Sequence, residues 1–205
     1  GGHGSMPENC IDPITAAAHI HIALQEINAR ELSQNDFGVL TTGRFAAGAA
    51  SNVIPDTAEM WGTIRTTDPE NKSGALIKQR MTEIAQGVAV AFRCTAEVTF
   101  SDFCPCMVVD ETLSKDAFGY LSEMLGQGVM DMTALTGGKP GGGSEDFAFV
   151  SHKVPTVSLF LACGGPAQGC RYSQHHPKVR FDDSVLYKGS AAYGYVAMRW
   201  LAEHK

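Results

Sequence analysis

The chain has 205 residues, of which 44% are hydrophobic and 19% charged, a composition typical of a globular protein. The net charge of -6 gives no electrostatic reason to expect nucleic acid or an anionic membrane as a partner, and no apolar run approaches the roughly 20 residues that a transmembrane helix needs. Six cysteines are too sparse for a disulfide scaffold in such a chain, so we expect reduced thiols and a cytoplasmic location.

The first half of the chain predicts alternating helices and strands. An Asp-Pro start followed by apolar residues at helical spacing predicts a helix over residues 12–30. Runs rich in Val, Thr and aromatic residues predict strands over 37–47 and 53–66. A second Asp-Pro start predicts a helix over 68–92, and alternation of apolar and polar residues predicts a strand over 96–100.

The order helix, strand, strand, helix, strand is that of a ferredoxin-like split motif without its first strand. That strand would precede residue 1, and so we expect the chain to begin inside a longer protein. For residues 1–103 the pattern therefore predicts an α+β domain, in which two helices cover one face of a small antiparallel sheet.

After about residue 103 the pattern changes. A helix is predicted over residues 111–125, and a glycine-rich stretch follows over 137–143. The apolar run 154–161 predicts a strand that is buried on both faces, and the amphipathic pattern over 185–201 predicts a final helix. We take residues 104–205 as the second part of the chain.

Two segments of the first part carry candidate functional residues, each with a plain alternative. The stretch around His3 has the composition of an expression-tag remnant, but it is equally typical of a flexible turn that presents a histidine. Asn52 and Arg65 lie at opposite ends of one predicted strand. The guanidinium group of arginine matches a carboxylate well, although an exposed surface arginine would have no such role.

The second part of the chain offers two further candidates. Three glycines lead through Gly143 into Ser144 and Glu145, and glycines let backbone N–H groups approach a bound anion closely. A plain solvated loop is the alternative. His175 precedes His176 and a proline in a loop and is a candidate metal ligand. A structural histidine is the alternative, and one ligand is too few for a metal site.

Taken together, four segments resemble the metallopeptidase-type amidohydrolase family that includes hippurate hydrolase, bacterial N-acyl-amino-acid amidohydrolases and plant auxin-conjugate hydrolases. The resemblance covers essentially the whole chain and favours His3 as native sequence. The matching segments, in order, are Gly1-Gly2-His3-Gly4-Ser5 with Pro7 and Asp12-Pro13-Ile14, Asn52-Val53-Ile54-Pro55 leading to Gly62-Thr63-Ile64-Arg65, Gly143-Ser144-Glu145-Asp146-Phe147, and His175-His176-Pro177 with Phe181 and Asp183.

The resemblance implies a domain for each part of the chain. Residues 1–103 would form a lid and dimerisation domain, and residues 104–205 the C-terminal portion of an α/β zinc-peptidase-like catalytic domain. In that family His3 would reach the active site of a neighbouring subunit and stabilise an oxyanion, while Asn52 and Arg65 would hold the carboxylate of the substrate.

Further site residues are implied for the second part. Gly143, Ser144 and Glu145 would line the substrate pocket, and His175 would be a metal ligand. The other metal ligands of the family and its glutamate general base lie upstream of the matching region, and no segment here matches them. Glu8 also stands where relatives often carry histidine.

The function that the resemblance implies is hydrolysis of the amide bond of N-acyl amino acids by a homodimer with two divalent ions, zinc or manganese. This chain would be the downstream part of that enzyme and would contribute one metal ligand. Two alternatives remain open: a catalytically incomplete fragment that dimerises and binds substrate, or a related metallo-exopeptidase.

Overall fold

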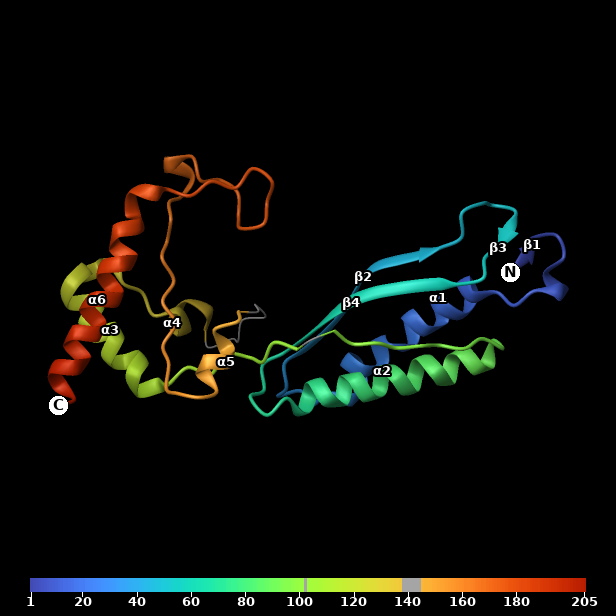
Figure 1. Ribbon diagram of the computed structural model, residues 1–205, viewed down its shortest axis with the longest axis horizontal. Coiled ribbons are helices and arrows are strands. Elements are labelled where there is room, and N and C mark those ends of the chain that lie inside the picture. The colour runs from blue at the N-terminus through green and yellow to red at the C-terminus, as the bar shows by residue number, and fades with distance from the viewer. Residues whose placement is uncertain (102, 138–144) are drawn as a thin grey trace. The chain divides into compact units, whose positions relative to one another are not determined.

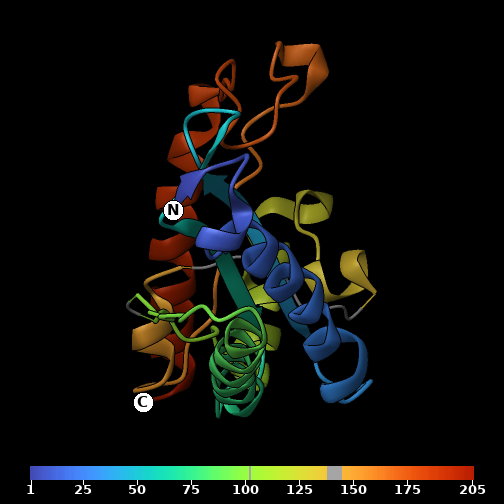
Figure 2. The same cartoon turned by 90° about the vertical axis from the view of Figure 1, so that its right-hand side faces the viewer.

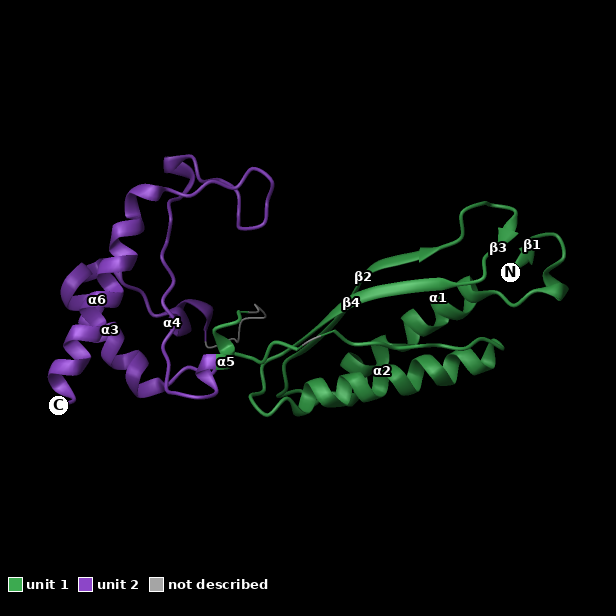
Figure 3. Ribbon diagram, in the orientation of Figure 1, with its two compact units in different colours: residues 1–107, 140–149 green, residues 108–139, 150–205 purple. Residues whose placement is uncertain are grey.

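The computed structural model describes residues 1–101, 103–137 and 145–205. Of these, residues 1–107 and 145–149 form one compact unit, unit 1, and residues 108–137 and 150–205 form a second, unit 2 (Figure 3). The elements before residue 107 are β1 (Gly2–His3), a 3-10 turn (Pro7–Asn9), α1 (Pro13–Ala23), a π-helical turn (Ile27–Glu31), β2 (Gly38–Ala47), β3 (Val53–Ile54), β4 (Ala58–Thr66) and α2 (Lys72–Ala91).

The strands of unit 1 form two antiparallel pairs. β2 pairs with β4 in a long ribbon that has a bulge at Gly43, and β1 pairs with β3. The single strand predicted over 53–66 is therefore two strands with different partners. Pro55 stands where the chain changes partner, and a proline has no N–H to donate to a strand ladder.

The two helix starts predicted in unit 1 differ in outcome. Asp12 caps α1 as predicted, because its carboxylate accepts the N–H of Ile14 at 2.9 Å. The predicted start of the second helix at Asp68 is wrong, since α2 begins only at Lys72. Residues 68–71 form a turn instead. The Asp68 carboxylate still accepts the N–H of Ser73 at 3.2 Å, so it caps the helix from outside.

Both helices pack against the same face of the β2–β4 ribbon, as the pattern predicted (Figures 1 and 2). The core is centred on Ile27 and Ile77, which are both fully buried. Met60 and Ile64 of β4 pack against this core. These two side chains lie on the inward face of β4.

The strand predicted over residues 96–100 is wrong. Ala96 and Val98 do pack against the core, and Glu97 and Thr99 are exposed, so the alternation correctly predicts burial at these four positions. It fails at Phe100, which is 40% exposed. Within the described residues, however, this extended segment pairs with no strand. Alternation reports which side chains are buried, whereas a strand also needs a hydrogen-bonded neighbour. The structure therefore shows small antiparallel sheets and not the complete ferredoxin-like motif.

The described part of unit 2 contains helices and extended segments. The helix predicted over 111–125 is confirmed, but the strand predicted over 154–161 is wrong. Those residues form no strand, and Phe160 is 78% exposed. The elements after residue 107 are α3 (Glu111–Leu125), a 3-10 turn (Gly126–Gly128), α4 (Met132–Thr136), α5 (Ala148–Ser151), 3-10 turns at Pro166–Gln168 and Asp183–Val185, and α6 (Leu186–Glu203). Across the described residues, no helix is both long and apolar enough to cross a membrane.

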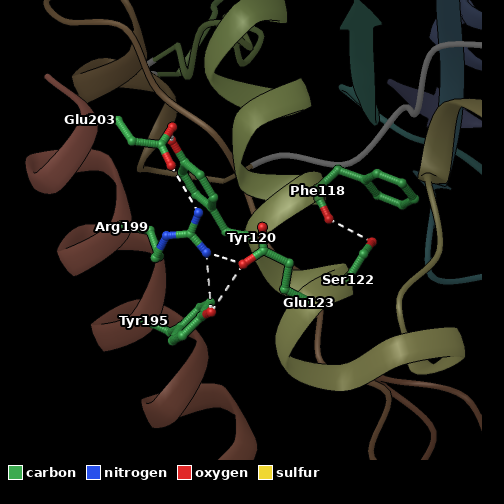
Figure 4. Close-up of polar contacts among 7 residues, drawn as sticks. All are labelled: Phe118, Tyr120, Ser122, Glu123, Tyr195, Arg199 and Glu203. Atoms are coloured by element: carbon green, nitrogen blue, oxygen red, sulfur yellow. Dashed lines mark hydrogen bonds and ion pairs between the residues drawn. The ribbon is translucent and has the colours of Figure 1, made fainter.

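Polar contacts join α3 to α6 (Figure 4). Arg199 of α6 donates to Glu123 of α3 and, at 2.9 Å, to Glu203 one turn further along α6. The buried Tyr120 of α3 donates its hydroxyl to Glu203 at 2.7 Å. This bond raises the pKa of Tyr120 to about 12, and together with Arg199 it lowers the pKa of Glu203. This network stabilises the packing of α3 against α6.

Candidate functional site

His3 lies in a tight turn that brings it beside Asn52. The N–H of Met6 donates to the carbonyl of His3 at 2.9 Å and closes the turn. The N–H of Gly4 donates to the carbonyl of Asn52 at 2.8 Å, and His3 pairs with Val53 in the β1–β3 ladder. Two of the predicted site residues, one on either side of this short ladder, are thus held together.

Ser5 fixes the imidazole ring of His3. Its backbone N–H donates to Nδ1 of His3 at 3.2 Å, and its hydroxyl oxygen lies 2.9 Å from the same nitrogen. The sequence did not single out Ser5, although the small residues that follow His3 were a signal for a turn. His3 itself is exposed, so its ring is held by local contacts and not by burial.

Buried contacts beneath the turn hold its backbone. A Cβ atom on Gly2 would lie only 2.6 Å from the sulfur of Cys10, which is itself buried. Arg93, just after α2, donates to the carbonyl of Cys10 at 3.3 Å. The turn that carries His3 therefore rests on Cys10 and, through it, on the segment that follows α2, a long-range arrangement that no local motif predicts.

Arg65 lies elsewhere in unit 1. It stands on β4 opposite Val39 and is exposed. Arg65 lies seven residue steps along β4 from Ala58, which at the usual rise of an antiparallel strand is roughly 24 Å. Figure 1 shows β3 beyond the opposite end of the ribbon, and Asn52 lies just before β3 in the connection 48–57 that joins β2 to β4 at that end. The structure does not bring Asn52 and Arg65 together within one chain.

Arg44 shares the outer face of the β2–β4 ribbon with Arg65, and its ladder partner Trp61 lies four positions before Arg65 on β4. Its guanidinium carbon lies 3.5 Å from the centre of the Trp61 ring, directly opposite in the ladder. This cation–π contact occupies Arg44. Arg65 is therefore the better candidate of these two cations for binding an anionic group of a substrate.

The predicted glycine-rich pocket loop is only partly described. Gly143 and Ser144 lie outside the described residues. Glu145 is exposed, and its carbonyl accepts both the N–H of Ala148 at 3.0 Å and the thiol of Cys104 at 3.3 Å. These bonds make Glu145 the start of the turn that leads into α5.

His175 and His176 differ in what holds them. The ring of His176 stacks on Tyr172 with 4.2 Å between the ring centres, and its Nδ1 accepts the N–H of Lys178 at 3.0 Å. His175 is exposed and has a φ of 70°, a conformation that is costly for a residue other than glycine and that recurs at functional sites. Of the two, His175 is the better candidate ligand.

The described residues do not by themselves make a metal centre. No group of three or more His, Cys, Asp or Glu side chains among them is placed to hold an ion. His175 alone is too few ligands for a divalent cation, and no reaction step through a metal is derived from these residues.

Comparisons with known proteins show what this chain is similar to. Residues 1–91 match a family described as the peptidase dimerisation domain. The chain is 31% identical to the IAA-amino acid hydrolase ILR1-like 4 of Arabidopsis thaliana, covering 100% of this chain and 46% of that protein. It is 32% identical to the N-acetylcysteine deacetylase of Bacillus subtilis, covering 97% and 48%. The chain thus spans just under half the length of these relatives.

A solved structure gives the same result. A dinuclear metal binding peptidase of the M20 family from Bacillus subtilis superimposes with a TM-score of 0.69 at 28% identity, covering 95% of this chain and 47% of that one. Both the sequence relatives and the structural neighbour extend the likeness well beyond residue 91. Residues 1–91 thus match the peptidase dimerisation domain, and over nearly its whole length the chain is similar to hydrolases and peptidases of the M20 family.

Proposed function

We propose that this chain is the downstream part of a homodimeric amidohydrolase that hydrolyses the amide bond of N-acyl amino acids. The observation that carries the proposal is the hydrogen-bonded turn that holds His3 beside Asn52, in a segment that matches a peptidase dimerisation domain. The relatives whose names specify hydrolysis of an amino-acid conjugate and deacetylation of an N-acetyl amino acid support this substrate class.

The distance between Asn52 and Arg65 favours an active site to which two subunits contribute different residues. A carboxylate is only a few Å across, so Asn52 and Arg65 of one chain do not hold the same carboxylate. We assign Arg65 to the substrate carboxylate in the subunit to which it belongs. His3 and Asn52 act together on a substrate bound to the neighbouring subunit, where the His3 ring donates to the oxygen that becomes negatively charged.

In the second part of the chain, His175 serves as a ligand, and Gly143, Ser144 and Glu145 line the pocket. The two divalent ions, zinc or manganese, would polarise the amide carbonyl and activate water. The remaining ligands and the glutamate that acts as general base come from the rest of the protein.

We assign residues 1–103 to a ferredoxin-like lid and residues 104–205 to the C-terminal portion of an α/β zinc-peptidase-like catalytic domain. The extended segment 96–100 supports the first assignment, because it offers an edge to a further strand upstream of residue 1. Large exposed apolar side chains in unit 2, such as Phe160, Tyr193 and Leu201, support the second, because they would be covered by the rest of such a domain. We assign the protein to the cytoplasm, because six cysteines are too sparse for a disulfide scaffold in a chain of this length.

Two other functions have specific support. The structural neighbour is described as a peptidase, which favours a metallo-exopeptidase that cleaves dipeptides. The second alternative is a fragment that dimerises and binds substrate without cleaving it. It is supported because His175 is the one candidate metal ligand among the described residues, and one ligand is too few for a metal site. Assaying the complete protein with hippurate, N-acetyl amino acids and dipeptides, each with Zn²⁺ or Mn²⁺, separates the three. Hydrolysis of dipeptides alone, or of nothing, would overturn the proposal.

Arg65 gives the sharper test in the active protein. Arg65→Ala should raise KM for N-acyl amino acids on the order of tenfold or more, while KM for the matching amides, which lack the carboxylate, changes little. Arg44→Ala is the matched control, because it removes a cation from the same face that already contacts Trp61. Equal effects of Arg65→Ala on acids and amides would remove Arg65 from the carboxylate site.

A further inference from the structure

We propose that Ser5 is a positioning residue that holds the His3 ring in the tautomer with its proton on Nε2. The proposal rests on the function assigned to His3 and deepens it. Since the neutral ring then offers an N–H to the substrate, the group it recognises must be a hydrogen-bond acceptor such as the acyl oxygen of an amide.

The tautomer follows from which atoms face each other. A backbone N–H can only donate a hydrogen bond, and that of Ser5 is aimed at Nδ1 of His3 at 3.2 Å. Nδ1 must therefore present its lone pair. The hydroxyl of Ser5, at 2.9 Å from the same nitrogen, can rotate to donate as well. A proton on Nδ1 would instead place two N–H groups against each other.

The neighbouring backbone keeps Ser5 in this position. The bond from Met6 to the carbonyl of His3 closes the turn, and the bond from Gly4 to the carbonyl of Asn52 ties it to the start of β3. Ser5 is thus fixed on a backbone that is bonded on both sides. The position of its N–H, and with it the tautomer, is set before any substrate binds.

This tautomer suits the role of His3. A ring protonated on Nε2 gives a neutral donor that can stabilise negative charge developing on an acyl oxygen. The other tautomer would offer a lone pair at Nε2 and repel that charge. Ser5 would therefore act on the reaction through His3, without contacting the substrate itself.

Nitrogen-15 NMR of the histidine rings in the complete protein tests the tautomer directly. The signals of His3 are assigned by their loss in His3→Gln. We expect a proton on Nε2 and none on Nδ1 in the neutral ring. A neutral ring protonated mainly on Nδ1 would overturn the proposal.

Variants of Ser5 test its contribution. Ser5→Ala keeps the backbone N–H but removes the hydroxyl, and so should shift the Nδ1 signal of His3; Ser5→Thr should restore it. Ser33→Ala is the matched control, because the Ser33 hydroxyl also contacts the N–H two residues on, in an exposed turn. An Nδ1 signal that is the same in wild type and Ser5→Ala would overturn the positioning role of the Ser5 side chain, because only its hydroxyl differs between the two proteins.

Kinetics of the complete protein give a second, independent readout. Ser5→Ala should lower kcat on the order of three- to tenfold, as expected for loss of one hydrogen bond, with KM unchanged. In a His3→Ala background the same change should cause no further loss. Additive losses would show that Ser5 acts separately from His3. If the complete protein cleaves no N-acyl amino acid, the proposed function fails, but the NMR result still decides the tautomer.

Discussion

At the scale of single residues, Gly4 limits where the His3 turn can lie. A Cβ atom at Gly4 would stand 3.1 Å from the carbonyl oxygen and 3.2 Å from the carbonyl carbon of Asn52, which is closer than ordinary van der Waals contact. Because both atoms belong to the backbone, relief requires the turn and β3 to separate. Glycine is thus needed here for a close approach of two backbones, and not for an unusual φ.

Gly4→Ala should therefore impair catalysis more than stability. We expect kcat/KM for N-acyl amino acids to fall on the order of tenfold, because a small displacement of an active-site group is costly, while the denaturation midpoint changes little. Gly87→Ala is the control, since nothing lies within 4 Å of a Cβ atom at that helical position. It should stabilise α2 by about 0.5–1 kcal/mol and leave the rate unchanged. An unaltered rate in Gly4→Ala would show that the turn tolerates the displacement.

At the scale of elements, α2 contributes the centre of the unit 1 core through Ile77, which is fully buried. Ile77→Ala should lower the free energy of unfolding by about 2–5 kcal/mol, and Ile77→Val by about 0.5–1.5 kcal/mol, because the surrounding side chains fill the cavity only partly. Val90→Ala on the same helix is the control, since Val90 is 74% exposed. Urea denaturation measures all three. Equal losses for Ile77→Ala and Val90→Ala would contradict the packing described.

The α3–α6 contact predicts a dependence of stability on alkaline pH. Folding raises the pKa of Tyr120 from about 10 to about 12, first through its hydrogen bond to Glu203 and then through burial. The unfolded chain therefore loses this proton at lower pH than the folded one, and stability should fall as the pH rises above about 10. Tyr120→Phe should remove that part of the fall, whereas Tyr187→Phe, at a position 67% exposed on α6, should not. Denaturation midpoints measured from about pH 8 to pH 11 decide this; the same fall in wild type and Tyr120→Phe would contradict it.

At the scale of the whole molecule, local patterns in the sequence predict helices and buried faces but not strand partners. The helix start at Asp12 and the helix over residues 111–125 were both predicted from signals within a single element, and the structure confirms both. The strands expected over 96–100 and 154–161 each need a neighbour far away in the sequence, and neither has one among the residues that the structure describes. Alternation and apolar composition carry no information about that neighbour.

The candidate site shows the same limit. The motifs pointed to His3, Asn52 and Arg65 as residue types suited to recognise an acyl amino acid, and the structure adds how they are distributed. Proximity of His3 to Asn52 depends on the β1–β3 pairing, and the distance to Arg65 depends on the length of β4. Neither quantity can be read from the motifs, because each depends on long-range pairing.

The distribution of these residues predicts that the active site is shared between subunits. In a homodimer, His3 of one chain would serve the site whose metal ligand, His175, belongs to the other chain. His3→Ala and His175→Ala should each abolish most activity, but for different reasons: the first should retain its metal content and the second should lose metal. When the two inactive proteins are mixed and allowed to exchange subunits, about half of the dimers are mixed, and each of these has one intact site.

The mixture should therefore recover about a quarter of the wild-type rate, once the two proteins have been unfolded and refolded together. His3→Ala mixed in the same way with the double variant His3→Ala/His175→Ala should recover nothing, because no dimer then contains an intact His3. If the first mixture also stays inactive although mixed dimers are seen by native mass spectrometry, His3 acts within its own subunit. The roughly 24 Å of β4 between the ends of the ribbon would then have to be bridged by movement within one chain, since both ends would serve a single substrate.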